Sequence, residues 1–217
     1  MKIACVVLAS GKSIRFKSPK TKVLYNVYGA PILEYTLKNI TKYINKNSLY
    51  ITIPKKISKN ETKLISKYTT NELIFGGKSR YDSLKNALKY IKLDKYDYII
   101  VHDGARPFTS RKIFQKIINL IKQNKYDCIA PYLKIEDTIR KNGISINRNS
   151  INSYQTPQAV KYKFFVNAVK NSKKIPTDEL GLFEKNKDLK IKLIDGCKSN
   201  IKITKLDDIN TFKKFYT

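Results

Sequence analysis

Four short stretches of this sequence carry arginine or lysine, and three of them also carry glycine, residue types that bind phosphate groups. They are SGKSIRFKSPK at residues 10–20, GGKSRYDS at 76–83, HDGARPF at 102–108 and NIKIT at 200–204. Arginine is scarce in the chain, yet Arg15, Arg80 and Arg106 all lie in these stretches. A guanidinium presents a planar fork of donors that matches phosphate oxygens. We therefore expect the partner to be a small phosphorylated molecule.

Gly11-Lys12-Ser13 in the first stretch raises the question of a nucleotide-hydrolysing P-loop. Such a loop needs a glycine five positions before the glycine of Gly-Lys-Ser, so that successive backbone N–H groups enclose the phosphates. Val6 occupies that position, inside an apolar run that is typical of a strand. The spacing therefore excludes the hydrolase loop, and the stretch remains a cationic cradle for a polyanion.

The net charge of +27 at pH 7 first suggests a nucleic-acid partner. Lysine supplies 38 of the 44 basic residues, however, and it is spread along the whole chain. This distribution is not typical of a patch that follows a nucleic-acid backbone. We expect no specific nucleic acid, and a basic nucleic-acid-binding protein stays as an alternative from a different functional class.

The sequence is expected to belong to a cytoplasmic protein. It contains no run of about 18 apolar residues, so no membrane span is expected. The first strand begins at Ile3, which leaves no room for a targeting peptide. Cys5, Cys128 and Cys197 lack any paired spacing, so we expect reduced thiols rather than a zinc site or disulfides.

Strand-like and helix-like segments alternate along the chain. Apolar runs predict strands at residues 3–9, 49–53, 73–75, 98–101, 128–132 and 191–194. Apolar residues at helical spacing predict helices at 31–44, 81–91, 162–169 and 206–215, one helix capped by Ser110 and a short one capped at Thr177. This alternation predicts an α/β fold with a Rossmann-like, mostly parallel sheet flanked by helices, in a single domain over residues 1–217.

One segment, at about residues 135–157, breaks the alternation. Asn142-Gly143 lies there between two short alternating runs, and Asn-Gly in that setting is a strong signal for a β-hairpin. We expect a hairpin arm that projects from the α/β body. An oligomer contact and a simple surface flap both remain open as its role.

The four cationic stretches follow predicted strands, and open parallel sheets bind ligands at the carboxyl ends of their strands. His102 is the only histidine and has no nucleophile to activate, which favours a structural role. Asp103, beside Arg106, suits holding Mg²⁺ or steering a substrate hydroxyl. The chemistry is then positional: cations and Mg²⁺ neutralise charge on a phosphorus under attack, as nucleotidyl transfer requires.

Taken in order, the motifs resemble those of the 2-C-methyl-D-erythritol 4-phosphate cytidylyltransferase family of the non-mevalonate isoprenoid pathway, over about residues 3–215. The matching segments are Ala9 to Phe16, Pro19-Lys20-Thr21, Gly76 to Ser83, His102 to Pro107, Asp137-Thr138, Arg148-Asn149, Thr156-Pro157-Gln158, Thr177-Asp178-Glu179 and Asn200 to Thr204. The resemblance implies CTP and a polyol phosphate as substrates, in a homodimer with exchanged arms.

The resemblance also implies a role for each matching residue. Arg15, Lys20, Arg148 and Lys202 would be catalytic; Ala9, Ser10, Gly11, Gly77 and Ser83 would bind CTP; Asp103, Arg106, Thr138 and Thr156 would bind the acceptor. Arg148 and Thr156, taken as arm residues, would reach the acceptor bound to the neighbouring subunit.

The chain departs from the family pattern at Ser13, Phe16, Thr21 and Gly104. The Ser-x-x-Arg-Phe form resembles the cytidylyltransferase half of bifunctional proteins that also carry a cyclodiphosphate synthase. Ribitol 5-phosphate cytidylyltransferase shares most of the loops, and Thr138, Arg148 and Lys202 together favour methylerythritol phosphate. A sugar-1-phosphate nucleotidyltransferase using UTP or dTTP is a further alternative.

Overall fold

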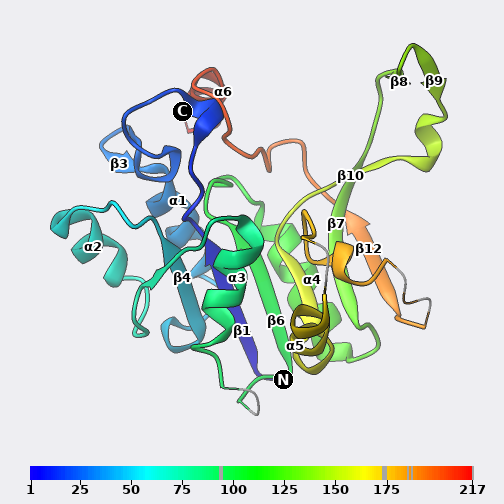
Figure 1. Cartoon of the computed structure of the whole chain (residues 1–217), viewed down its shortest axis with the longest axis horizontal. Helices are drawn as coiled ribbons and strands as arrows, with labels where there is room; N and C mark the ends of the chain where they lie inside the picture. Colours follow the sequence, from blue (N-terminus) through cyan, green and yellow to red (C-terminus); the bar gives the residue numbers. More distant parts are fainter. Residues whose placement is uncertain (93–94, 173–174, 185, 187, 217) are drawn as a thin grey trace.

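A mostly parallel sheet forms the centre of the molecule in the computed structural model, which describes residues 1–92, 95–172, 175–184, 186 and 188–216 (Figure 1). Its strands pair in the order β10-β7-β11-β6-β1-β4-β5, and β12 also pairs with β7, outside this path. They are β1 Ile3–Leu8, β4 Leu49–Ile53, β5 Ile74–Phe75, β6 Tyr98–Asp103, β7 Cys128–Lys134, β10 Asn152–Tyr154, β11 Gln158–Lys161 and β12 Ile191–Asp195. Only β10 and β11 run antiparallel to their neighbours, so the predicted fold class is confirmed.

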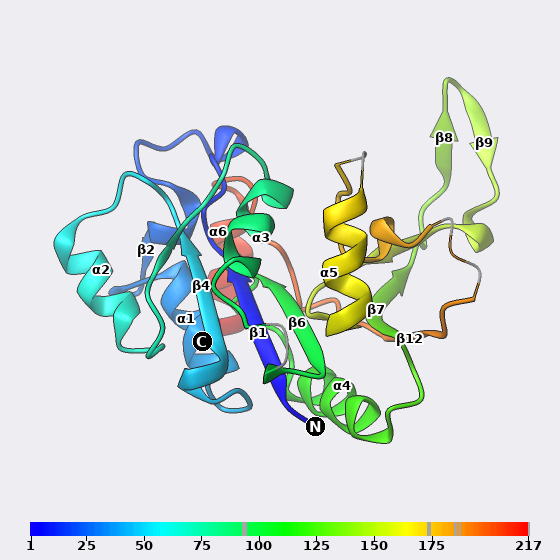
Figure 2. The ribbon, with the colours of Figure 1, turned by 60° about the horizontal axis from the view of Figure 1, so that its bottom comes forward.

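Helices cover both faces of the sheet (Figure 2). One face carries α1 Ile32–Ile40, α4 Arg111–Gln123 and α6 Asp208–Tyr216, and the other carries α3 Arg80–Leu88 and α5 Tyr162–Asn171. Strand β1 shows why two cores form, because successive side chains of a strand point to opposite faces. Cys5 and Val7 join the core under α1 and α4, whereas Ala4 and Val6 join the core under α3 and α5. No helix in the described residues is long and apolar enough to cross a membrane.

Local capping signals account for several helix boundaries. The Ser110 hydroxyl accepts a hydrogen bond from the Ile113 N–H at the start of α4, as predicted. Helix α2, Lys59–Ser66, was not predicted, although Ser58 and Glu61 form a reciprocal capping box at its first turn. The predicted helix capped at Thr177 is wrong: a three-residue 3₁₀ turn, Leu180–Leu182, follows Glu179 and has no side-chain cap.

The predicted hairpin is present and projects from the body as an arm (Figure 1). Strands β8 Ile139–Lys141 and β9 Ile144–Ile146 pair antiparallel across Asn142 and Gly143, whose φ angles of 51° and 81° are those a tight hairpin turn requires. The arm is shorter than predicted. Because β10 pairs with β7 in the central sheet, residues 152–157 belong to the body.

Two short strands outside the central sheet, β2 Asn26–Val27 and β3 Ala30–Pro31, pair antiparallel with each other.

Candidate active site

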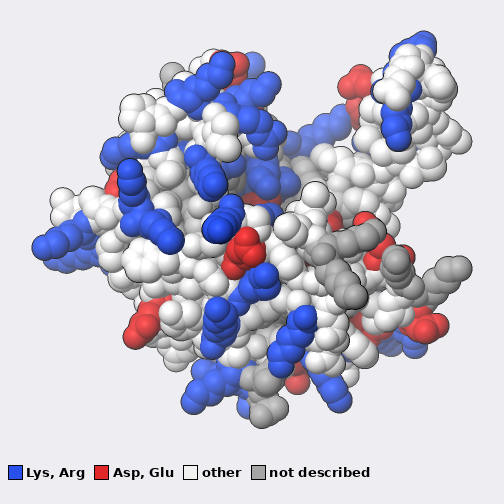
Figure 3. All heavy atoms as spheres, in the orientation of Figure 1, with Lys and Arg blue, Asp and Glu red and all other residues white. Residues whose placement is uncertain are grey.

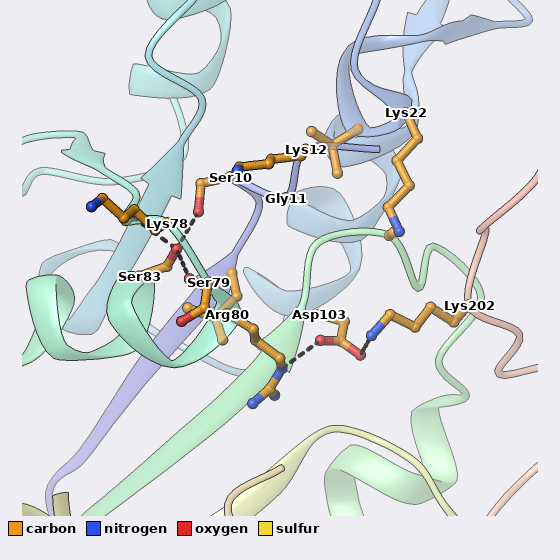
Figure 4. A pocket seen from close by; sticks show the side chains of 14 residues that line it. Ser10, Gly11, Lys12, Lys22, Lys78, Ser79, Arg80, Ser83, Asp103 and Lys202 are labelled. Carbon is orange, nitrogen blue, oxygen red and sulfur yellow. Dashed lines mark hydrogen bonds and ion pairs between the residues drawn. The ribbon is translucent and has the colours of Figure 1, made fainter. Parts of the chain in front are cut away.

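The four cationic stretches meet at one cavity beside the carboxyl ends of β1 and β6 (Figure 4). The cavity has a volume of about 260 Å³ and takes its lining from every one of them. Ser10, Gly11 and Lys12 come from the first stretch, Gly77, Lys78, Ser79, Arg80 and Ser83 from the second, Asp103 and Ala105 from the third and Lys202 from the fourth. The convergence predicted from strand ends is therefore present in the structure.

One side of the cavity is a neutral cradle of serine hydroxyls and glycine backbone. Ser10 Oγ donates to Ser83 Oγ at 2.8 Å, and Ser83 Oγ accepts from the Gly77 N–H at 3.1 Å. Glycine is required at this close approach, since a Cβ on Gly76 would lie 2.0 Å from Ser10 Oγ and one on Gly77 would lie 2.3 Å from Asp82 Cβ. The cradle offers hydroxyls and backbone groups at the start of α3, which suit a nucleotide.

The opposite side is a cluster of charges around the buried carboxylate of Asp103. Its Oδ1 accepts from Arg80 Nε at 3.3 Å, and its Oδ2 accepts from Arg106 Nε at 3.2 Å and from Lys202 Nζ at 2.9 Å. Although burial alone raises the pKa of Asp103, the three cations hold it well below its usual range. Three positive charges on one carboxylate leave this side of the cavity positive, which favours a phosphate ligand.

Arg80 is held from behind by Glu179, a carboxylate that the sequence analysis did not assign to the site. Arg80 Nη1 and Nη2 donate to the two oxygens of Glu179 at 2.7 Å and 3.0 Å. The Glu179 side chain is fully buried, and its backbone N–H donates to Gln158 Oε1 at 3.1 Å. This bidentate pair fixes the guanidinium that in turn orients Asp103.

His102 has the structural role that the sequence predicted. Its ring is fully buried, with Nδ1 at 3.0 Å from Thr156 Oγ1 and Nε2 at 3.2 Å from Thr109 Oγ1. Burial lowers its pKa to about 3, so the imidazole stays neutral at physiological pH. Because both ring nitrogens already have partners, His102 is not available as a general base for this cavity.

The cations of the first loop do not lie where the resemblance would put them. Arg15 is exposed and does not line the cavity, and Lys20 Nζ pairs at 3.4 Å with Glu61 of α2. Lys22, two residues after Lys20, does line the cavity. Ala9 is buried behind the cradle, where its N–H donates to the Thr52 carbonyl at 3.2 Å.

A second cavity, of about 300 Å³, lies against the same charge cluster. Arg80, Asp103 and Lys202 line both cavities, and Arg106 and Thr156 line the second one. Thr156 is therefore not an arm residue, as the sequence analysis took it to be. It is buried in the body, where its Oγ1 accepts from the Asp103 N–H at 3.0 Å.

The true arm residues lie away from both cavities of their own chain. Thr138 is exposed, and Arg148 donates from Nη1 to the carbonyl of Glu136 within the arm. Arg148 also lines a hollow of about 420 Å³ with Lys134, Glu136 and Asn152. Neither Thr138 nor Arg148 lines the two cavities that meet at Asp103.

The surroundings of Asp103 do not fit a direct metal ligand. The described residues contain no group of three histidine, cysteine or acidic side chains that could hold an ion. A cation bound by Asp103 would have to displace Lys202 or an arginine from its oxygens. The protein alone therefore provides no Mg²⁺ cage here.

Sequence comparison relates the chain to one enzyme family. The family model described as IspD: 2-C-methyl-D-erythritol 4-phosphate cytidylyltransferase matches residues 3–216. The 2-C-methyl-D-erythritol 4-phosphate cytidylyltransferase of Clostridium perfringens is 34% identical over 96% of this chain and 96% of its own length. The bifunctional enzyme IspD/IspF of Pelagibacter ubique is 36% identical over 97% of this chain, which spans 57% of that relative.

Solved structures give the same relationship. The 4-diphosphocytidyl-2C-methyl-D-erythritol synthase of Anaerococcus prevotii has a TM-score of 0.80 at 26% identity, over 99% of this chain and 98% of its own. The bifunctional IspDF of Campylobacter jejuni has a TM-score of 0.81 at 28% identity over 97% of this chain. This chain covers 54% of that protein.

Proposed function

The chain belongs to the 2-C-methyl-D-erythritol 4-phosphate cytidylyltransferase family, and on that basis we propose that it transfers the cytidylyl group of CTP to 2-C-methyl-D-erythritol 4-phosphate. The products are pyrophosphate and 4-diphosphocytidyl-2-C-methyl-D-erythritol, a step of isoprenoid precursor biosynthesis. The observation that carries this proposal is that the Ser10–Ser83 cradle and the Asp103–Lys202 pair line one and the same cavity, the one of about 260 Å³. A nucleotide and a phosphorylated acceptor can thus meet at one cationic cluster.

The reaction needs alignment and charge stabilisation rather than a covalent intermediate on the protein. An oxygen of the acceptor phosphate attacks the α-phosphorus of CTP, the bond to the bridging oxygen breaks, and pyrophosphate leaves with that electron pair. The cradle side would hold the cytidine, and the second cavity, with Arg106 and Thr156, would hold the acceptor. Lys202 lines both cavities, which supports a role for its ammonium in neutralising the charge that would develop between the two substrates.

Arg15 and Lys20 have proposed roles on the triphosphate that require the first loop to move. The Lys20–Glu61 pair is at the surface, with 61% of the lysine side chain exposed. Exposed ion pairs of this kind contribute at most about 1 kcal/mol, so a triphosphate can compete with Glu61 for the ammonium. Both residues lie on a loop adjoining the cavity, which supports that exchange.

We propose that Mg²⁺ enters with CTP, held mainly by phosphate oxygens and water, because Mg²⁺ commonly binds through substrate phosphates. Bound in that way, it would neutralise part of the triphosphate charge.

A cytoplasmic location is also proposed, supported by the free thiols of Cys5, Cys128 and Cys197.

We further propose a homodimer in which each arm completes the acceptor site of its partner. The projecting arm carries Thr138 and Arg148, which contact neither cavity of their own chain. An exposed arginine on such an arm is suited to reach a phosphate held by another copy.

Arg148→Ala is expected to lower activity at least about tenfold, because it removes one charge-assisted contact of about 1.5–3 kcal/mol. The dimer should stay intact. Steady-state rates and sedimentation velocity on the same preparation measure the two effects. Arg140→Ala, on the same arm, is the matched control. In the part of the chain that the structure describes, the Arg140 guanidinium donates a hydrogen bond only to the Gly143 carbonyl of the hairpin turn. Unchanged activity per dimer in Arg148→Ala would leave the arm as an assembly element only.

Pyrophosphate release from CTP and 2-C-methyl-D-erythritol 4-phosphate, with Mg²⁺, tests the proposed reaction directly. Release should require both substrates, and UTP or ATP in place of CTP should give little product. Faster turnover with ribitol 5-phosphate would mean that ribitol 5-phosphate, and not 2-C-methyl-D-erythritol 4-phosphate, is the acceptor.

Nucleic acid is expected to bind weakly and without sequence preference. Lys and Arg side chains are spread over the face shown in Figure 3, with Asp and Glu side chains among them.

A further inference from the structure

Four buried polar side chains from separate parts of the chain form one hydrogen-bonded network beside the second cavity. They are His102, Thr109, Thr156 and Asn200. His102 Nδ1 lies 3.0 Å from Thr156 Oγ1, and His102 Nε2 lies 3.2 Å from Thr109 Oγ1, which in turn lies 2.8 Å from Asn200 Oδ1. Of these four described residues, Thr156 alone lines the second cavity. Thr156 is therefore the point at which the network can meet a ligand.

The carbonyl oxygen of Thr156 fixes the orientation of the Asn200 amide. Asn200 Nδ2 lies 2.9 Å from that carbonyl, which can only accept, so the amide –NH2 faces it and Oδ1 faces Thr109. Oδ1 can only accept as well, and the Arg106 carbonyl, 3.3 Å from Thr109 Oγ1, is a second acceptor. The single hydroxyl hydrogen of Thr109 is therefore directed away from His102.

The remaining hydrogen positions follow from the neutral state of the imidazole. Thr109 has no hydrogen left for the ring, so its contact at 3.2 Å requires a hydrogen on His102 Nε2. Burial lowers the pKa of His102 to about 3, which keeps the ring neutral at physiological pH. A neutral imidazole carries one ring hydrogen, and Nδ1 is then an acceptor. Thr156 Oγ1 must therefore donate to Nδ1 at 3.0 Å.

The Thr156 hydroxyl is left with one unused lone pair. Its hydrogen goes to His102 Nδ1, and one of its two lone pairs accepts from the Asp103 N–H at 3.0 Å. We propose that His102 is a positioning residue of the polyol-phosphate site, which holds the Thr156 hydroxyl so that it accepts a hydrogen bond from a hydroxyl group of the substrate. This inference rests on the proposed function, because it takes the second cavity as the site of the polyol phosphate.

This direction of donation discriminates between the two kinds of oxygen in a polyol phosphate. A hydroxyl can donate to the free lone pair of Thr156, whereas an ionised phosphate oxygen can only accept and would find no hydrogen there. The cations that line the same cavity, Arg80, Arg106 and Lys202, are the groups that suit the phosphate. His102 thereby favours one orientation of the substrate, with a hydroxyl at Thr156 and the phosphate at the cations.

His102 is the only histidine of the chain, so one labelled residue reports these hydrogen positions directly. With nitrogen-15 histidine in the full chain, the ring should carry its hydrogen on Nε2 and none on Nδ1, unchanged between pH 8 and pH 5. Adding 2-C-methyl-D-erythritol 4-phosphate should shift the Nδ1 resonance, because the substrate and His102 share the Thr156 hydroxyl. CTP alone should shift it far less. A hydrogen on Nδ1, in a neutral or a charged ring, would overturn the proposal.

Two substitutions of His102 separate positioning from folding, because each keeps one half of the ring contacts. The carboxamide of His102→Asn can place an oxygen near the position of Nδ1 and accept from Thr156. That of His102→Gln can place its –NH2 near the position of Nε2 and donate to Thr109. Each variant loses one hydrogen bond of the network, so we expect similar decreases in melting temperature.

The two variants should differ in the KM for the polyol phosphate. His102→Gln should raise this KM about threefold to tenfold, the effect of one hydrogen bond, whereas His102→Asn should stay within about twofold of the wild type. The KM for CTP should change less than about twofold in both. An equal rise in the KM for the polyol phosphate in the two variants would mean that His102 only supports the fold.

The Nδ1 resonance of the wild type decides the proposal even where a variant does not fold. No shift with a polyol phosphate that the protein turns over would overturn it. Ribitol 5-phosphate is the second probe, since it also carries hydroxyl groups. A shift with ribitol 5-phosphate, in a protein that does not use 2-C-methyl-D-erythritol 4-phosphate, would support the positioning role while the proposed substrate fails.

Discussion

Lys202→Met is expected to lower kcat about a hundredfold or more, the range for removing one group that stabilises charge in a transition state. The ammonium lies 2.9 Å from Asp103 Oδ2 and lines both cavities, so it is close to the point where we propose that the two substrates meet. Arg80 and Arg106 still compensate Asp103 in the variant, and we therefore expect the fold to persist. Single-turnover rates of pyrophosphate release, with far-ultraviolet circular dichroism for folding, measure both expectations.

Lys205→Met is the matched control for this prediction. Lys205 is exposed on the same segment, three residues beyond Lys202, and lines neither cavity. Its loss should change kcat less than about twofold, because isolated surface charges contribute little. The Kd for CTP should change far less in Lys202→Met than kcat does. A variant with normal kcat and weakened CTP binding would make Lys202 a nucleotide-binding group with no part in the transition state.

Features encoded by neighbouring residues could be predicted from the sequence. Residues 49–53 form the strand that their apolar run predicts, Ser110 caps α4, and Asn142-Gly143 forms the hairpin turn. The cap and the turn depend on contacts within a few residues, and the strand is marked by the composition of its own apolar run. The convergence of the loops was also predictable, because the carboxyl ends of parallel strands necessarily share one edge of the sheet.

Features decided by distant contacts could not be predicted. Strand β11 inserts antiparallel between β6 and β7, and nothing in its four residues specifies those partners. Thr177-Asp178-Glu179 has the local form of a helix start, but Glu179 instead meets Arg80, which is distant in the sequence. Lys20 and Lys22 are two positions apart, yet Lys20 pairs with Glu61 of α2 whereas Lys22 lines the cavity, and no local pattern distinguishes them.

The burial of Glu179 gives the largest expected effect on stability. Glu179→Gln is expected to lower the free energy of unfolding by about 3 kcal/mol, since removing one partner of a buried ion pair leaves the other charge uncompensated. Arg80 makes two of its three charged contacts to Glu179, at 2.7 Å and 3.0 Å, and keeps only the longer one to Asp103 in the variant. Urea unfolding at pH 7 measures the change from the midpoint and slope.

Glu184→Gln provides the comparison, because Glu184 is exposed nearby and its loss should change stability by less than about 0.5 kcal/mol. The double variant Arg80→Met with Glu179→Gln removes the orphaned cation and should recover part of the lost stability. If the Arg80–Glu179 pair contributed only as much as a weak surface contact, Arg80→Met and Glu179→Gln would each lower the free energy of unfolding by under about 1 kcal/mol. The two losses would then add in the double variant. Recovery of stability without recovery of activity would mean that Glu179 stabilises the fold through the same guanidinium that orients Asp103 for the reaction.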